Sequence, residues 1–152
     1  MKRILSLLLA LVFVFSFAAS AFAITPPAGY EQPSASKMKT LCDGLNKDDS
    51  QFIFTYDENL GAVVINTFYG ENSDPQKSII NLMKSAENGD ESAKNTVALW
   101  EMMYKRQAES FLETFFELHA YVNVVFRCLD PLADNAIALE YIDGIRTSYR
   151  PE

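Results

Sequence analysis

The stretch that decides the fold is AESFLETFFELHAYVNVVFRC, residues 108–128. Up to Leu118 its apolar residues recur every three or four positions, which is typical of one face of a helix. From Val122 onward they alternate with the intervening residues, which is typical of a strand whose side chains point to opposite faces of a sheet. The sequence therefore predicts a switch from helix to strand here, and a fold that combines both.

The helical rhythm extends upstream as far as Asp90 or Glu91, whose charges suit the positive end of a helix dipole. The steps between its apolar residues average close to the 3.6-residue turn of a helix. We therefore predict a long helix up to Leu118. Its apolar stripe consists of Ala93, Val97, Trp100, Tyr104, Ala108, Phe111, Phe115 and Leu118.

A shorter helix is predicted before the long one. Asp74-Pro75 favours a helix start, because Asp accepts hydrogen bonds from free N–H groups and Pro lacks an N–H that would have no partner there. Asn88-Gly89 is typical of a helix stop. The inner stripe of this helix consists of Ile79, Leu82, Met83 and Ala86.

Two runs nearer the N-terminus predict a β-hairpin, at residues 51–56 and 62–69. They flank a polar loop in which Gly61 can adopt a positive φ. Ahead of the hairpin, Ser34 or Ser36 can cap a short helix. The apolar residues of this helix are Met38, Leu41, Cys42 and Leu45.

Downstream of the switch, residues 137–142 and 145–149 predict two further strands, joined by the two-residue turn Asp143-Gly144. The order is therefore helix, two strands, two helices, three strands. We predict a single two-layer α+β domain over residues 34–152. Its antiparallel sheet combines the N-terminal hairpin with a C-terminal three-stranded meander, and about three helices pack against it.

The first 23 residues predict a cleavable export signal. Lys2 and Arg3 precede an apolar run at 4–17, and Ala21-Phe22-Ala23 fits the small-residue pattern that a signal peptidase recognises. A cut after Ala21 is one alternative, and an uncleaved membrane anchor of roughly 20 residues is another. Cleavage after Ala23 predicts a secreted or periplasmic product without a stable membrane anchor, beginning with an extended Pro-rich leader at 24–33.

The chain is acidic, with 13 Lys and Arg against 20 Asp and Glu and a formal net charge of −7. Lys2 and Arg3 are the charged residues of the predicted signal, so its removal changes the net charge from −7 to −9. Binding to a phosphate backbone requires clustered Lys and Arg, and anionic membrane surfaces attract the same residues. The composition therefore argues against nucleic acid and anionic membranes as partners.

The C-terminal part carries a pattern that extends over roughly residues 50–149. It comprises Asn88-Gly89-Asp90, Trp100, the strand at 122–127, Asn135, Leu139, Asp143-Gly144 and Tyr149. In this pattern the chain resembles small secreted bacterial α+β proteins of unknown function. The resemblance implies the same fold, without an activity to carry over. Cys42 and Cys128 are not features of that group.

The two cysteines predict a disulfide between Cys42 and Cys128, because exported proteins meet an oxidising environment. A bridge closing a loop of about 86 residues would contribute roughly 4–4.5 kcal/mol on the chain-entropy estimate. The alternative is a pair of buried, unbonded thiols that act as small hydrophobic side chains, because both cysteines fall on predicted apolar faces.

No residue is predicted to be catalytic, cofactor-binding or metal-ligating. His119 is the only histidine, and its place at a helix end favours a structural cap or a partly exposed side chain over a general base. No G-x-S-x-G turn occurs, and a zinc site needs more His and Cys than the chain has. Two oxygen-rich loops lack the spacing of a calcium loop. These contain Asp43, Asn46, Asp48 and Asp49 in one loop and Asp130, Asp134 and Asn135 in the other.

A second apolar line on the long helix, beside its main stripe, predicts an interaction face at Leu99, Met103, Leu112 and Phe116. The sequence thus favours a non-catalytic exported interaction or scaffold domain, which binds another copy of itself or another exported protein. Edge strands offer a second route, by strand addition. The alternative function is that of a small extracytoplasmic carboxylate-based hydrolase or divalent-metal binder.

Overall fold

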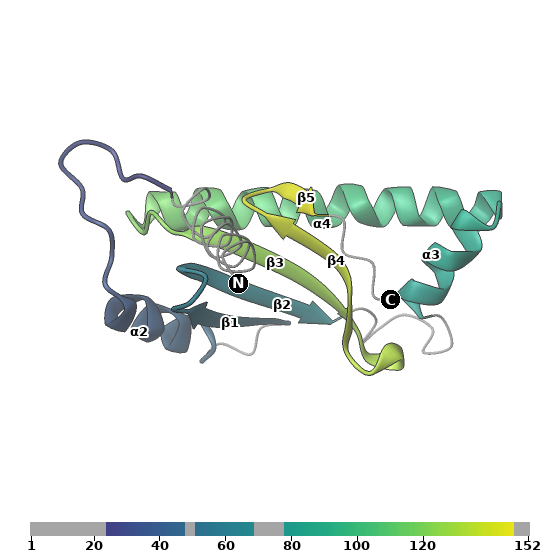
Figure 1. Ribbon diagram of the computed structural model, residues 1–152, viewed down its shortest axis with the longest axis horizontal. Helices are drawn as coiled ribbons and strands as arrows, with labels where there is room; N and C mark the ends of the chain where they lie inside the picture. Colours follow the sequence, from purple (N-terminus) through teal and green to yellow (C-terminus); the bar gives the residue numbers. More distant parts are fainter. Residues whose placement is uncertain (1–23, 48–50, 69–77, 148–152) are drawn as a thin grey trace, which may run out of the picture.

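The computed structural model describes residues 24–47, 51–68 and 78–147. They form an α+β fold in the predicted order of helices and strands. The elements are α2 (Ala35–Leu45), β1 (Phe52–Asp57), β2 (Ala62–Phe68), α3 (Ile79–Glu87), α4 (Glu91–Glu117), β3 (Asn123–Asp130), the 3₁₀ turn η1 (Pro131–Ala133), β4 (Ala136–Ile142) and β5 (Ile145–Thr147). Figure 1 shows α4 running the length of the molecule, with α2 at one end and α3 at the other.

The five strands lie in the order β1-β2-β3-β4-β5, so the hairpin and the meander join in one sheet. The sheet is mixed, which corrects the prediction of a purely antiparallel one: β2 and β3 are parallel, and the other neighbours are antiparallel. The reason is the long connection between them. The 27 residues of α4 span about 40 Å and return the chain to the end at which β2 begins, so β3 runs in the same direction as β2 (Figure 1).

Most helix boundaries follow from local capping. Ser34 caps α2, and Asp90 caps α4 by accepting hydrogen bonds from the N–H groups of residues 92 and 93. The predicted start of α3 at Asp74-Pro75 lies outside the described residues. In the structure α3 begins at Ile79, where the side chain of Ser78 is the cap.

The core lies between the helices and one face of the sheet. Phe126 is fully buried on the central strand β3, and Phe111 from α4 stacks on it with ring centroids 5.8 Å apart. Phe115 and Tyr141 are also buried in this layer. The hydroxyl of Tyr141 donates a hydrogen bond of 2.9 Å to the backbone carbonyl of Glu101, which links β4 to the middle of α4.

Burial along β3 alternates less than predicted, because Val125 is buried together with its neighbours in the strand. Val125 belongs to a small apolar cluster with Ala62 and Val64, and Ile142 packs against it. These four residues lie on the sheet face opposite the main core.

The turn between β4 and β5 forms as predicted. Asp143 and Gly144 both have positive φ, of 50° and 77°, which is the conformation of a type I′ hairpin. Asp143 also exchanges hydrogen bonds with the backbone of Val124, through its own N–H and its carboxylate. Burial raises the pKa of this carboxyl.

Candidate interaction surface

The solvent-facing side of α4 carries three large apolar side chains that are about half exposed. They are Leu99 at 51%, Met102 at 45% and Met103 at 50%. Their spacing of three and four residues places them next to one another on the helix surface. We call these three residues the α4 patch. Met102 was absent from the predicted face, although its position three residues after Leu99 could have placed it there.

The four residues of the predicted face do not lie together. Leu112 follows Met103 by nine residues, or about two and a half turns, so it points to the other side of the helix. There it packs against the core. Phe116 packs against Tyr121, with ring centroids 5.6 Å apart. Only Leu99 and Met103 therefore belong to an exposed surface.

One member of the predicted inner stripe also lies elsewhere. Leu118 is 53% exposed, because α4 ends at Glu117 and the chain turns away there. The N–H groups of His119 and Ala120 donate to the carbonyls of Phe116 and Phe115, the pattern of a Schellman stop. His119 occupies the left-handed position of this motif, with φ 55°.

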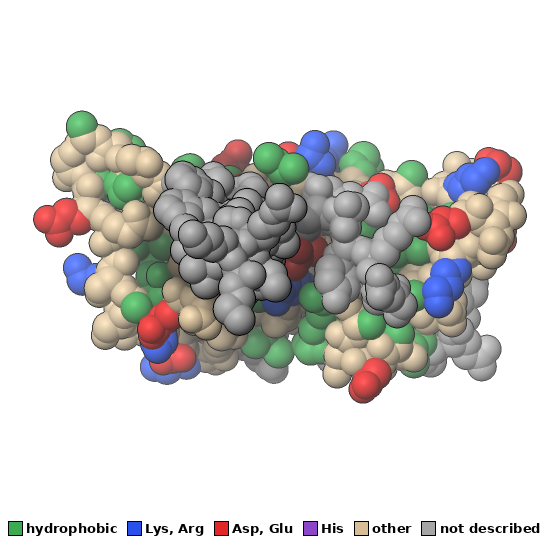
Figure 2. All heavy atoms as spheres, viewed as in Figure 1, with side chains coloured by type: hydrophobic (Ala, Val, Ile, Leu, Met, Phe, Trp, Pro, Cys, Tyr) green, Lys and Arg blue, Asp and Glu red, His purple; other side chains and the backbone are tan. Residues whose placement is uncertain are grey.

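The side of α4 that carries the patch changes character along the helix. Steps of three and four residues continue it from Leu99 and Met103 through Arg106 to Ser110, Glu113 and Glu117. All of these positions are exposed, but those beyond Arg106 are polar or charged. The Lys105–Glu109 ion pair lies at the flank of this side, with 3.7 Å between its charged atoms. Figure 2 shows hydrophobic, acidic and basic side chains in turn along the edge that α4 forms.

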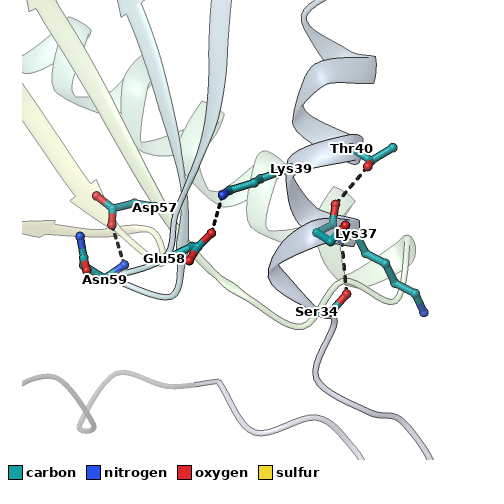
Figure 3. A network of polar contacts seen from close by, with 8 residues as sticks. Ser34, Lys37, Lys39, Thr40, Asp57, Glu58 and Asn59 are labelled. Atoms are coloured by element: carbon teal, nitrogen blue, oxygen red, sulfur yellow. Dashed lines mark hydrogen bonds and ion pairs between the residues drawn. The ribbon is translucent and has the colours of Figure 1, made fainter.

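The edge of the sheet at β1 is blocked by a side chain. The amide of Asn46, just after α2, accepts a hydrogen bond from the N–H of Phe54 and donates one to its carbonyl, each 2.8 Å long. It thereby occupies backbone groups of β1 that face away from β2. Lys39 of α2 also pairs with Glu58 in the β1–β2 turn (Figure 3). Strand addition at this edge would have to displace Asn46.

His119 lies at the surface among aromatic rings. Tyr30 stacks on it with ring centroids 4.8 Å apart, and Nδ1 of His119 lies 3.5 Å from the hydroxyl of Tyr121. His119 is exposed, which agrees with the predicted partly exposed side chain; its backbone N–H, which donates to the carbonyl of Phe116, takes part in the end of α4.

Asp130 is fully buried, and its carboxylate is occupied by structural hydrogen bonds. It accepts from the hydroxyl of Ser78 at 2.5 Å and from the N–H of Ile80 at 3.1 Å, and so binds the start of α3. It also accepts from the N–H of Leu132 at 2.9 Å and caps η1. In the same oxygen-rich loop, Asp134 and Asn135 are exposed turn residues with φ of 56° and 57°.

The other predicted oxygen-rich loop is only partly described, since Asp48 and Asp49 lie outside the described residues. Asp43 is exposed on α2, and Asn46 holds the β1 edge. Within the described part of the chain, no group of three or more His, Cys, Asp or Glu residues is placed to hold a metal ion.

Cys42 and Cys128 are both buried and unbonded in the structure. Burial raises the pKa of each thiol to about 11. Cys42 belongs to α2, which is attached to β1 through Asn46, whereas Cys128 lies on β3 with β2 in between. Neighbouring strands are about 4.8 Å apart, so β1, the strand to which α2 is attached, lies two such spacings from β3.

In the described ranges, no helix has the length and hydropathy needed to cross a membrane. Comparisons of the chain with protein families, with curated proteins and with solved structures found no match. The resemblance to small secreted bacterial proteins therefore stays a prediction.

Proposed function

We propose that this chain is an exported, non-catalytic interaction domain that associates with a second copy of itself through the α4 patch. The observation that carries the proposal is the change along the solvent-facing side of α4. Ser110, Glu113 and Glu117 occupy this side in the second half of the helix, so folding does not require apolar residues there. Leu99 and Met103 occupy it in the first half and are half exposed.

A second copy of the chain matches this pattern of side chains on α4. If two α4 helices pair in antiparallel fashion about a twofold axis at Glu101, Leu99 of one copy lies opposite Met103 of the other. Ser92 then lies opposite Ser110, so apolar residues meet apolar ones and polar residues meet polar ones. A twofold contact uses the same patch on both copies, and antiparallel helices also oppose their dipoles.

The association is expected to be weak. Three half-exposed side chains provide much less than the roughly 800 Å² per partner of a standard interface. The net charge of −9 on each processed copy also opposes association, because like charges repel across the contact. Raising the salt concentration screens this repulsion, and so should strengthen the dimer. A basic partner protein would show the opposite dependence on salt.

The test is sedimentation velocity of the chain over a range of concentrations, at low and high salt. The double variant Leu99→Glu/Met103→Glu should remain monomeric where the unchanged protein forms dimers. Leu60→Glu is the matched control, since Leu60 is 51% exposed but lies in the β1–β2 turn. Equal dimerisation of the double variant and the unchanged protein would contradict the proposal, as would a monomer under all conditions.

A further inference from the structure

The segment at residues 24–33, which we call the N-terminal strap, contains no helix or strand but is attached to the domain at three points. The backbone N–H of Ile24 donates to Oδ1 of Asn123 at 3.1 Å. The side-chain amide of Gln32 donates to the carbonyl of Tyr121 at 3.1 Å. Between these points, the ring of Tyr30 packs against Tyr121 with centroids 5.3 Å apart.

The three attachments are to Tyr121, on the short connection after α4, and to Asn123, at the start of β3. Tyr30 also stacks on His119, the non-glycine residue at the left-handed end of α4. Asn123 is the first residue of β3 and is only 7% exposed. The strap therefore packs over the place where the chain changes from helix to strand.

The attachment at Ile24 coincides with the predicted cleavage point. Hydrolysis of the Ala23–Ile24 peptide bond consumes one water, leaves a carboxylate on Ala23 and converts the amide N–H of Ile24 into an α-ammonium group. The nitrogen that already donates to Asn123 would then carry a positive charge and three N–H groups. Hydrogen bonds from a charged donor are roughly twice as strong as neutral ones.

We propose that Asn123 is the binding site for the α-ammonium group of the processed chain, so that cleavage after Ala23 tightens the N-terminal strap. The inference rests on the predicted cleavage site and is independent of self-association through α4. It assigns to Asn123 a role that begins only after export. The uncut precursor offers the same side chain a neutral amide donor.

The experiment compares the exported product of the full chain with the uncut precursor, which is purified after export is blocked. Mass spectrometry reads the N-terminus of the product, and the rate of α-amine labelling near neutral pH reports how well the amine is held. Labelling of the folded product should be at least about tenfold slower than labelling of the same chain in urea, which corresponds to the net contribution of one hydrogen bond to a charged group.

Two variants distinguish docking of the amine from mere burial. Asn123→Asp should slow labelling of the product further, because a carboxylate holds an ammonium more strongly than an amide oxygen does, yet it should lower the melting temperature of the precursor. Asn123→Ala should speed labelling. Asn135→Asp, an exposed change of the same chemistry, should alter neither. Labelling that is equal in the folded and urea-unfolded product, or a product that begins at a residue other than Ile24, would overturn the inference.

Discussion

The first and second halves of α4 expose different kinds of side chain to solvent. On the outer side, the first half carries the α4 patch, whereas the second half carries Ser110, Glu113 and Glu117. On the inner side, the second half is anchored by Phe115, which is fully buried. Apolar residues of α4 that face the sheet are therefore part of the core, whereas those of the patch lie about half in solvent. Under the proposed function, the patch contributes to association and little to folding.

The strongest test of this difference compares two truncations to alanine. Phe115→Ala removes a buried ring from the second half and should lower the free energy of unfolding by about 3–5 kcal/mol. Leu99→Ala on the first half should change it by less than about 0.5 kcal/mol, as surface substitutions usually do. Urea denaturation measures both. A similar cost for the two variants would contradict the division of α4.

The anchoring of α3, which packs beside the first half of α4 (Figure 1), depends on Asp130. Asp130→Ala leaves buried donors of Ser78 and Ile80 without their acceptor, and should cost about 3 kcal/mol in denaturation. Asp134→Asn is the control, because Asn tolerates the left-handed conformation that Asp134 adopts. Hydrogen exchange in Asp130→Ala should rise in α3 before it rises in the second half of α4.

Thiol reactivity distinguishes buried from exposed positions of the molecule. A pKa of about 11 for Cys42 and Cys128 leaves roughly 100-fold less thiolate at pH 8 than an ordinary cysteine has. A thiol introduced by Met102→Cys should therefore be alkylated at least about 100-fold faster than the native pair.

Without reductant, the unfolded chain should take up two alkyl groups on its native cysteines. A chain that takes up none, and is two mass units lighter, would instead contain the disulfide.

The smallest expected effect on stability is that of the double variant Leu99→Glu/Met103→Glu. Both side chains already lie about half in water, so the free energy of unfolding should change by no more than about 0.5–1 kcal/mol. Because the change in stability is small, a loss of dimers in this variant reports the loss of the contact and not unfolding of the chain. A loss of several kcal/mol would mean that the patch belongs to the core.

Much of the fold could be predicted from local signals. The bounds of α4 were expected from the charge at Asp90 and the change of apolar rhythm after Leu118, and the structure confirms both within one residue. The Asp143-Gly144 turn and the hairpin of β1 and β2 were predicted from turn residues and alternation. Such features depend on neighbours in the sequence, which periodicity and capping rules describe directly.

The remaining features depend on contacts between distant parts of the chain. The parallel pairing of β2 with β3 results from the path of the two intervening helices. Ser78, the cap of α3, also donates a hydrogen bond to Asp130, which lies 52 residues later in the chain. Leu112 is not part of an exposed face with Met103, because the step of nine residues between them corresponds to about two and a half helical turns. The block at the β1 edge was missed because Asn46 belongs to an oxygen-rich stretch typical of a solvated loop.

The most direct test of association through α4 is cross-linking by Met102→Cys, next to the proposed twofold axis. Mild oxidation should join two copies of this variant through the new thiols, whereas Leu60→Cys, at an equally exposed leucine in the β1–β2 turn, should give little covalent dimer. The native thiols are buried and should not interfere. Equal cross-linking of the two variants, or none by Met102→Cys at concentrations where the chain sediments as a dimer, would contradict the account.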